Sequence, residues 1–304
     1  MDKLNIHQDI QAIWPDTAWS HVTDQLTSKF HDPQAKTLFI NAIEDLFFFQ
    51  AKGYNKNFSP TPETLQSFDS WVGVSHQHRM FLNDEPYLDH TMHGKRSRVL
   101  TDGLVWDDKG LREWSYFQKS MDKCKCLITL SQYMKNHWKK RFPELNVINL
   151  YHPVAKRQHM FNIEKFKSNK HVRCLGTWGR DYTIWDELKI DYTKSSTRDN
   201  YLSYDEYDLM FVDTVIFLDV EDASANNAVL ESIQRNTPIL TRRHPAIVEY
   251  LGTDYPLYFE TLEQASSLLS NIDNITQAYM YLQHMDKQHI QIETFLQNVS
   301  DLNI

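Results

Sequence analysis

The chain has 304 residues, of which 41% are hydrophobic, 24% charged and 13% aromatic, and its formal net charge is −8. This length allows two domains with a buried core each, and the composition excludes a disordered or low-complexity chain. The negative charge argues against a protein that coats nucleic acid through bulk electrostatics, because phosphate contacts need a local excess of lysine and arginine.

The N-terminal stretch contains Asp2 and Asp9 and lacks the basic patch and apolar core of a secretory signal. The longest apolar runs, LFFF and VIFL, are too short to cross a bilayer. The three cysteines, Cys124, Cys126 and Cys174, cannot form a disulfide framework, and no second ligand pair at zinc-site spacing accompanies them. We therefore expect a cytoplasmic protein with reduced thiols.

The first hundred residues show weak periodicity. AWSHVTDQLTSKF (18–30) is amphipathic, and KTLFINAIEDLFFFQ (36–50) is either a strand followed by a helix or one continuous helix, because short apolar runs fit both. SWVGVSHQHR (70–79) predicts a strand that ends in a polar loop.

A clear alternation of helices and strands begins at residue 111. The predicted elements are a helix in LREWSYFQKSMDKC, a buried strand in CLITL, a helix in SQYMKNHWKKRF that Ser131 caps and Pro143 ends, and a strand in NVINLY. This βαβ order implies a parallel sheet flanked by helices. His152 and Pro153 then begin a connection, where we expect His152 to pack at a hinge.

A second alternating series begins at residue 171. Its predicted strands are HVRCLG (171–176), TVIFLDV (214–220), TPIL (237–240) and YPLYF (255–259), and its predicted helices are YDEYDLMFV (204–212), NNAVLESIQR (226–235), PAIVEYLG (245–252) and TLEQASSLL (261–269). The stretch 181–203 is polar, rich in turn formers and harder to assign. The chain is therefore predicted to be an α/β protein with two Rossmann-like lobes, each a parallel sheet flanked by helices.

We place the domain boundaries after residues 153 and 272. Residues 1–153 form an N-terminal Rossmann-like domain, residues 154–272 a C-terminal one, and residues 273–304 a mainly helical tail, a C-terminal bridging helix long enough to pack back across both lobes. In an open α/β sheet, ligands bind beyond the carboxyl ends of the strands and against helix N-termini. The candidate residues are therefore those that follow the predicted strands.

The glycines exclude two common phosphate sites. Only eight are present, and none forms the dinucleotide fingerprint or the Walker loop, in which glycines let the backbone approach phosphate closely. An NAD enzyme or a P-loop ATPase is therefore disfavoured.

Polar side chains follow the predicted strand 214–220. Ser224, Asn226 and Asn227 lie at the start of the next helix, where side-chain donors and unpaired backbone N–H groups suit a diphosphate. Glu231 lies one turn into that helix, where a carboxylate can accept hydrogen bonds from a ribose diol. Ordinary N-capping of the helix explains the polar residues equally well.

A second strand end, in LGTWGRDY, carries a basic residue. Gly176 and Gly179 bracket a turn through Thr177 that brings Arg180 toward the same crevice. A guanidinium there could neutralise a developing phosphate charge, and a surface salt bridge is the alternative.

A third strand end is basic as well, because Arg242 and Arg243 follow the predicted strand 237–240. Exposure of both arginines to solvent is the alternative. Three basic or amide-rich strand ends at one crevice nevertheless favour a ligand site over three unrelated surface features.

The segment SANNAVLESIQRNTPILTRRHPAIVEYLGTDYPLYF (224–259) resembles the C-terminal lobe of GT-B glycosyltransferases, two-lobed enzymes that bind a nucleotide sugar there. WVGVSHQHR and CKCLITLSQYMKNHWKKRFPELNVINLYHP are similar to the acceptor-side strand and the linker entry of the same proteins. The resemblance does not include residues 1–65.

The resemblance implies that Glu231 holds the nucleotide ribose and that Ser224, Asn226 and Asn227 contact the diphosphate and the sugar. Many GT-B relatives carry a glutamate eight residues before the ribose-binding one, but here that position is Ala223. This departure leaves recognition of the sugar hydroxyls in doubt, and the two asparagines are the residues that could supply it.

His76 and His78 are the candidate bases for the acceptor hydroxyl, because a neutral imidazole titrates near neutral pH. On an extended segment the two side chains point the same way, so they could bind a metal ion together, but the sequence suggests no third ligand. A purely structural role for each histidine is the other alternative. A base at this position would favour inversion at the anomeric carbon, and its absence would favour retention. Arg180 is the candidate for stabilising the leaving diphosphate.

These features predict a metal-independent hexosyl- or pentosyltransferase that needs no cofactor and moves a sugar from a UDP- or GDP-sugar to a hydroxyl acceptor. The acceptor stays open between a glycan, a metabolite, a lipid-linked saccharide, a protein and a hydroxylated nucleic-acid base. The last would need the basic clusters at 93–98 and 135–141 to line the cleft. A non-catalytic nucleotide-sugar sensor or subunit is one alternative, and a nucleotide-sugar epimerase is a weaker one.

Overall fold

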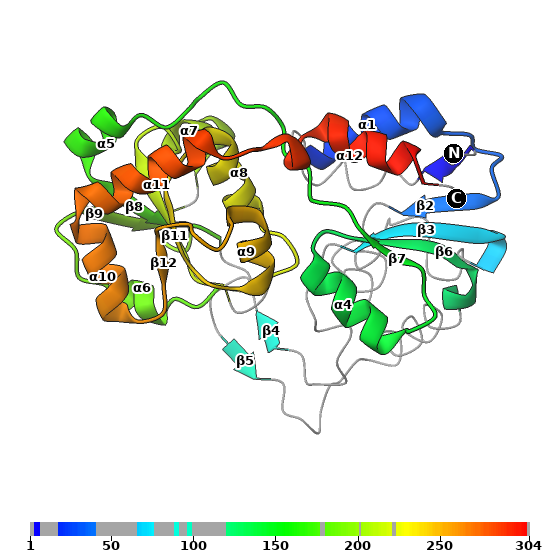
Figure 1. Ribbon diagram of the computed structural model, residues 1–304, viewed down its shortest axis with the longest axis horizontal. Helices are drawn as coiled ribbons and strands as arrows, with labels where there is room; N and C mark the ends of the chain where they lie inside the picture. The colour runs from blue at the N-terminus through cyan, green and yellow to red at the C-terminus, as the bar shows by residue number, and fades with distance from the viewer. Residues whose placement is uncertain are drawn as a thin grey trace. The chain divides into compact units, whose positions relative to one another are not determined.

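A computed structural model describes residues 3–6, 18–40, 66–75, 88–90, 96–98, 120–176, 180–200, 202–220 and 223–302. The chain divides into two compact units, shown in Figure 1. Unit 1 comprises Met1–Tyr87, Leu100–Ala155 and Gln288–Ile304, and unit 2 comprises Leu88–Val99 and Lys156–Lys287. The chain passes from unit 1 into unit 2 at Leu88 and again at Lys156, and the segment 273–304 is divided between the two units.

Unit 1 contains a five-stranded parallel sheet in the order β1-β2-β3-β6-β7. The strands are β1 (Asn5–Ile6), β2 (Thr37–Ile40), β3 (Ser70–Ser75), β6 (Cys124–Thr129) and β7 (Val147–Asn149). The helices of this unit are α1 (Ala18–Phe30), α4 (Gln132–Arg141) and α12 (Ile292–Ser300), with the 3₁₀ turns η4 (Met121–Lys123) and η5 (Gln288–Ile290). The parallel order confirms the βαβ interpretation of this half.

Local signals explain how α4 begins and how it packs on the sheet. The Ser131 side chain accepts a hydrogen bond from the Met134 backbone N–H, as the predicted N-cap should. Trp138 then buries its ring against Trp71 and Leu127 of the sheet. Its indole N–H donates to Ser75 Oγ at 3.1 Å, so the burial leaves no polar group of the ring unsatisfied.

Unit 2 contains a second five-stranded parallel sheet, in the order β12-β11-β10-β8-β9. The strands are β8 (His171–Cys174), β9 (Thr193–Ser196), β10 (Thr214–Leu218), β11 (Ile239–Arg242) and β12 (Tyr258–Phe259). The helices are α5 (Ile163–Asn169), α6 (Thr183–Glu187), α7 (Tyr204–Met210), α8 (Asn227–Arg235), α9 (Pro245–Leu251), α10 (Leu262–Ser270) and α11 (Ile272–His284). A separate antiparallel pair joins β4 (Leu88–His90) to β5 (Arg96–Arg98).

The strand order of unit 2 reverses between β8 and β10. From β8 the chain moves outward to β9, whereas from β10 it moves the other way to β11 and β12. The carboxyl ends of β8 and β10 therefore flank a topological switch point, where open α/β sheets leave a crevice for ligands. The polar stretch 181–203, which carried no clear prediction, supplies α6 and the edge strand β9.

The C-terminal segment contains two helices rather than one. α11 ends at His284 in unit 2, and α12 packs beside α1 in unit 1, where Lys29 Nζ donates to Ser300 Oγ at 3.1 Å (Figure 1). Val154 donates its backbone N–H to Ile290 O at 2.9 Å. The two segments that connect the units therefore lie side by side at Val154 and Ile290.

The three cysteines are free thiols. Burial raises the pKa of Cys126 and of Cys174 to about 12 in each case. Neither thiol is therefore ionised at neutral pH, which fits the expectation of reduced thiols.

His152 is buried, and burial lowers the pKa of its imidazole from 6.5 to about 4, while the hydrogen bond from Nδ1 to Pro153 O opposes this shift. Below pH 6.5 the imidazole takes up a proton in the unfolded chain but stays neutral in the folded chain. The free energy of unfolding should therefore decrease as the pH is lowered, by about 2 kcal/mol at pH 5. Denaturant unfolding at neutral pH and at pH 5 measures this loss. His152→Asn should remove about that much of the pH dependence, and an unchanged dependence would contradict the assignment.

Candidate functional site

The three strand ends that the sequence marks as candidates meet at the switch point of unit 2. Arg180, which follows β8, forms an antiparallel bridge with Val220, which follows β10. Next to it, the Asp181 backbone N–H donates to Asp219 O at 3.0 Å. From β11, Arg242 Nε donates to Asp219 Oδ1 at 2.7 Å, so the structure brings all three connections together around Asp219.

Helix α8 follows β10 in the chain, and a side-chain cap fixes where it begins. Asn226 has an extended backbone, and its side chain accepts a hydrogen bond from the Ala228 N–H at 3.0 Å. The capping interpretation is therefore correct for Asn226. Asn227 is the first helical residue and is exposed, whereas Ser224 is buried. The start of α8 thus presents an exposed carboxamide and a helix N-terminus beside the end of β10.

Glu231 lies one turn into α8 and is nearly buried, with 9% of its surface exposed. Its carboxylate is held by two guanidinium groups. Arg157 reaches Oε1 through Nη2 at 2.8 Å and Oε2 through Nε at 3.2 Å, and Arg235 reaches Oε2 through Nε at 3.2 Å. The structure therefore places Glu231 in an ion-pair cluster, a feature that the sequence analysis missed.

Arg235 is the centre of this cluster. It is completely buried, pairs with Asp208 of α7 as well as with Glu231, and donates to His159 O at 3.2 Å. Its guanidinium also lies over the Phe211 ring, 4.9 Å from the centroid. Arg157, Glu231, Arg235 and Asp208 together carry two positive and two negative charges, so the burial of each charge is compensated by a neighbour.

Tyr207 on α7 is half-buried, and its phenol interacts electrostatically with both the Glu231 cluster and Arg180. Burial raises the pKa of the Tyr207 phenol, the charge of Glu231 raises it further, and Arg235, Arg157 and Arg180 act in the opposite direction. The phenol is therefore within electrostatic reach of all four groups. Arg180 and Glu231 are 51 residues apart in the chain, yet both act on the pKa of the Tyr207 phenol.

The Arg180 side chain packs back against Leu175 and Gly176. Its Nε donates to Leu175 O at 3.0 Å, and burial lowers the pKa of its guanidinium. Gly176 has φ +85°, and a Cβ atom there would lie 2.7 Å from Arg180 Nε. The glycine is therefore needed both for its left-handed backbone and for the close approach of the arginine.

The two arginines after β11 have different surroundings. Arg242 contacts Asp219, stacks over the Phe259 ring and donates to Glu260 O at 2.9 Å. Arg243 stacks over the Tyr258 ring at 4.6 Å and donates to Thr253 O in the connection that follows α9. The structure therefore brings Arg242 to the crevice, while the contacts of Arg243 lie toward the α9–β12 connection.

Three candidate groups lie outside the described residues, namely Thr177, Gly179 and the histidine pair His76 and His78. Their roles stay predictions. Of the residues that were missed, Arg235 had a local signal, because Glu and Arg four positions apart on a helix form an ion pair. Asp219 and Arg157 had none, since their contacts join distant parts of the chain.

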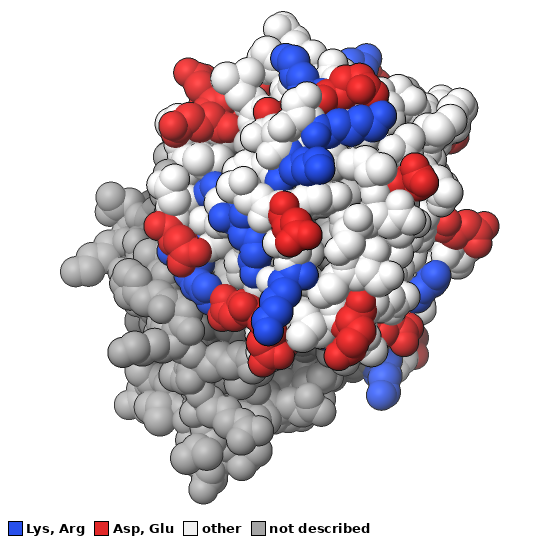
Figure 2. Space-filling model, turned by 90° about the vertical axis from the view of Figure 1, so that its left-hand side faces the viewer, with Lys and Arg blue, Asp and Glu red and all other residues white. Residues whose placement is uncertain are grey.

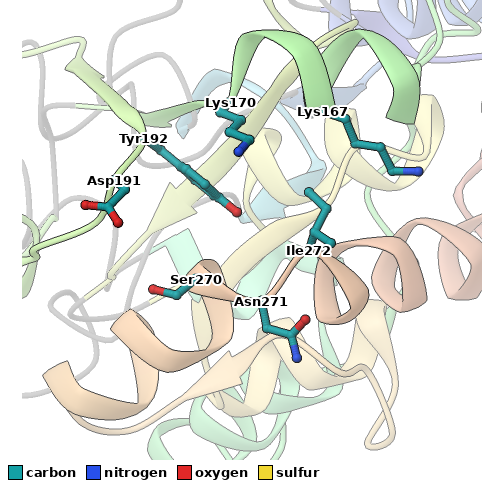
Figure 3. A pocket seen from close by; sticks show the side chains of 7 residues that line it. All are labelled: Lys167, Lys170, Asp191, Tyr192, Ser270, Asn271 and Ile272. Atoms are coloured by element: carbon teal, nitrogen blue, oxygen red, sulfur yellow. The ribbon is translucent and has the colours of Figure 1, made fainter.

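A cavity of about 480 Å³ lies elsewhere in unit 2, lined by Lys167, Lys170, Asp191, Tyr192, Ser270, Asn271 and Ile272. Figure 3 shows the Tyr192 hydroxyl and the Lys170 ammonium projecting into it. Lys170 immediately precedes β8, and Tyr192 immediately precedes β9. The cavity is therefore at the amino ends of these strands, the edge of the sheet opposite the switch-point crevice.

The face of unit 2 shown in Figure 2 carries both signs of charge. Lysine and arginine side chains run across it in a band, with aspartate and glutamate on either side. Opposite charges also pair in this unit, as in Lys167–Glu164 at 2.8 Å and Arg198–Asp186 at 2.6 Å. This face therefore lacks the uniform charge that a phosphate backbone would need.

Within the ranges that the structure describes, no group of three or more His, Cys, Asp and Glu side chains is arranged to hold a metal ion. In the same ranges, no helix combines the length and the apolar character needed to span a membrane.

Each of the two units contains a five-stranded parallel sheet flanked by helices, and the C-terminal segment returns to the first unit. This arrangement is the GT-B fold. WaaG, a glycosyltransferase involved in lipopolysaccharide biosynthesis, has a TM-score of 0.57 at 11% identity, over 99% of this chain and 100% of its own. HepE from Anabaena, solved with UDP and glucose, has a TM-score of 0.57 at 10% identity, over 99% and 98%.

TarM has the same fold in a longer chain. Its TM-score is 0.51 at 10% identity, and the match covers 93% of this chain but only 57% of TarM. No protein-family model and no curated protein matches the sequence. The predicted GT-B type of fold is therefore confirmed by structural likeness alone.

Proposed function

We propose that this protein transfers a sugar from a nucleoside-diphosphate sugar to a hydroxyl acceptor. The observation that carries the proposal is the meeting of Arg180 and Arg242 with the end of β10, the strand against which α8 packs, at the switch point between β8 and β10. Cationic side chains and a helix N-terminus at this place suit a diphosphate. HepE, which shares the fold, was solved with UDP and glucose, and this supports the same class of ligand.

In this proposal the diphosphate lies against the N-terminus of α8, near Asn227 and the Arg180 guanidinium. A bound anion would offset the cost of desolvating the half-buried Arg180. Glu231 accepts hydrogen bonds from the ribose hydroxyls, and Ser224, Asn226, Gly176 and Thr177 complete the walls. Arg243 contacts the outer part of the donor only if it leaves Thr253.

The reaction breaks the bond between the anomeric carbon and the diphosphate oxygen and forms a bond from that carbon to the acceptor oxygen. The leaving diphosphate gains negative charge, which the fixed positive charge of Arg180 and the α8 N-terminus stabilise without a metal ion. The acceptor hydroxyl loses its proton to a base, for which His76 and His78 stay the predicted candidates. The sugar is proposed to be a hexose or a pentose carried by UDP or GDP.

Nucleotide binding tests the site, and product formation tests the reaction. UDP or GDP at a hundredfold excess over its Kd should stabilise the folded protein by about 2.7 kcal/mol, measured as a rise in Tm. Arg180→Gln should weaken this effect, whereas Lys167→Ala, which removes an exposed lysine paired with Glu164, should not. Transfer from a panel of UDP-, GDP- and CMP-sugars to a mixture of acceptors should yield a glycosylated product.

Three results would contradict parts of this proposal. Binding without transfer or hydrolysis would indicate a sensor or subunit, and conversion of the nucleotide sugar without any acceptor would indicate an epimerase. An Arg180→Gln variant with unchanged nucleotide affinity would move the site elsewhere.

Gly176→Ala should weaken nucleotide binding about as much as Arg180→Gln does, because the added Cβ would displace the Arg180 side chain. Gly252→Ala is the matched control, since Gly252 also has a left-handed backbone, with φ +82°, and a Cβ there would meet the Tyr281 hydroxyl. Each variant should lose about 1–3 kcal/mol of stability through backbone strain. Calorimetric Kd values should separate them, and equal affinities for the nucleotide would argue against a role for the Gly176 turn.

A further inference from the structure

Arg157 binds Glu231 on both carboxylate oxygens from a segment of the chain that has no helix or strand. It lies one residue after Lys156, at which the chain enters unit 2. The Nη2–Oε1 and Nε–Oε2 distances are 2.8 and 3.2 Å, so the contact is a two-point ion pair. The side chains of Arg157 and Glu231 are only 13% and 11% exposed. The pair is therefore largely shielded from competing water.

The hydrogen-bonding capacity of Glu231 limits what else it can bind. A carboxylate offers about four acceptor positions, two on each oxygen. Arg157 uses one on Oε1 and one on Oε2, and Arg235 uses a second position on Oε2. One position on Oε1 is left, whereas a ribose diol that donates both of its hydroxyls needs two.

Of the two arginines, Arg157 is the one that a ligand can replace. The Arg157 side chain is 13% exposed, whereas that of Arg235, on α8 itself, is only 1% exposed. If Arg157 leaves, Glu231 still has Arg235 as a counter-ion, so the carboxylate stays ionised and paired. If Arg235 left, the carboxylate of Asp208 would lose its guanidinium partner.

We propose that Arg157 occupies the face of Glu231 that the ribose of a nucleotide needs, and that nucleotide binding displaces Arg157 from the carboxylate. This inference rests on the proposed function, because it deepens the role of Glu231 in that site. The paired state is not competent to bind the diol, so it lowers the apparent affinity by the fraction of molecules in which Arg157 is engaged. Donor binding is thereby coupled to the connection that enters unit 2.

The test compares ribose with deoxyribose nucleotides. Arg157→Met keeps the length and apolar body of the side chain and removes its hydrogen-bond donors. We expect this variant to bind UDP or GDP, whichever the wild type binds, roughly 3- to 10-fold more tightly, because the competing ion pair is lost. The affinity for the matching 2′-deoxynucleotide, which offers only one hydroxyl, should change much less. Arg157→Lys, which keeps the charge but loses the two-point contact, should change the affinities in the same direction.

The possible outcomes separate this inference from the proposed function. A wild type that binds neither nucleotide overturns both. In another outcome, the wild type binds the nucleotide while Arg157→Met binds it more weakly and no longer prefers ribose over deoxyribose. This result would show that Arg157 positions Glu231, and it would overturn the inference alone. An equal change for both sugars in Arg157→Met would assign Arg157 to the diphosphate and also overturn it. Isothermal calorimetry on the full chain gives the affinities, and Lys167→Ala serves as the charge control.

Discussion

Replacing Arg235 with methionine is expected to lower the free energy of unfolding by about 3–5 kcal/mol, because the cluster of Arg157, Glu231 and Asp208 then holds two negative charges and only one positive charge. Arg235 is completely buried and pairs with Asp208 and Glu231 at the same time. Methionine fills most of its volume over the Phe211 ring but cannot donate to either carboxylate. Denaturant unfolding of the purified variant measures the loss.

A matched surface pair gives the control for this prediction. Arg198 pairs with Asp186 at 2.6 Å, but its side chain is 35% exposed, so Arg198→Met should cost only about 0–1 kcal/mol. Adding Asp208→Asn to Arg235→Met should recover part of the loss, because it removes the negative charge that Arg235 no longer compensates. An Arg235→Met protein as stable as the Arg198→Met protein would show that the cluster contributes little to stability.

The second large effect is expected at Glu231. Glu231→Gln should weaken binding of UDP or GDP by roughly 10- to 100-fold, because hydrogen bonds to a charged acceptor are worth about 1.5–3 kcal/mol. Most of the loss should be specific to the ribose, so the affinity for the 2′-deoxynucleotide should fall much less. Calorimetric titration with both nucleotides measures the difference between them.

The control for Glu231 is another paired carboxylate of the same unit. Glu164 pairs with Lys167 at 2.8 Å on the exposed surface of α5, and Glu164→Gln should leave the nucleotide affinity unchanged. Because Glu231→Gln also disturbs Arg157 and Arg235, its stability must be measured alongside. A stable, folded Glu231→Gln protein with wild-type nucleotide affinity would remove Glu231 from the binding site.

Much of unit 2 could be predicted from local patterns, because helix caps and apolar runs act over a few residues. Pro245 begins α9 and Gly252 ends it with φ +82°, as predicted from the order of proline and glycine. The apolar run 214–220 contains the buried strand β10. These signals, repeated along the chain, were enough to predict two parallel α/β sheets.

Two features of the fold have no such local signal and were not predicted. The polar stretch 181–203 contains α6 and β9, yet β9 is an edge strand with a partner on one side only, so it needs no continuous apolar run. The predicted tail 273–304 is interrupted between His284 and Ile292, where the sequence has no proline or glycine to mark the break.

The sequence by itself therefore determined the alternation of elements, the polar start of α8 and the position of Glu231 one turn into that helix. Only the tertiary structure decided what surrounds Glu231, since Arg157 is 74 residues away in the chain and reaches it through the folding of unit 2. The physical reason is range: caps and periodicity act between neighbours in sequence, whereas the ion pairs of a site depend on which strand ends the sheet order places side by side.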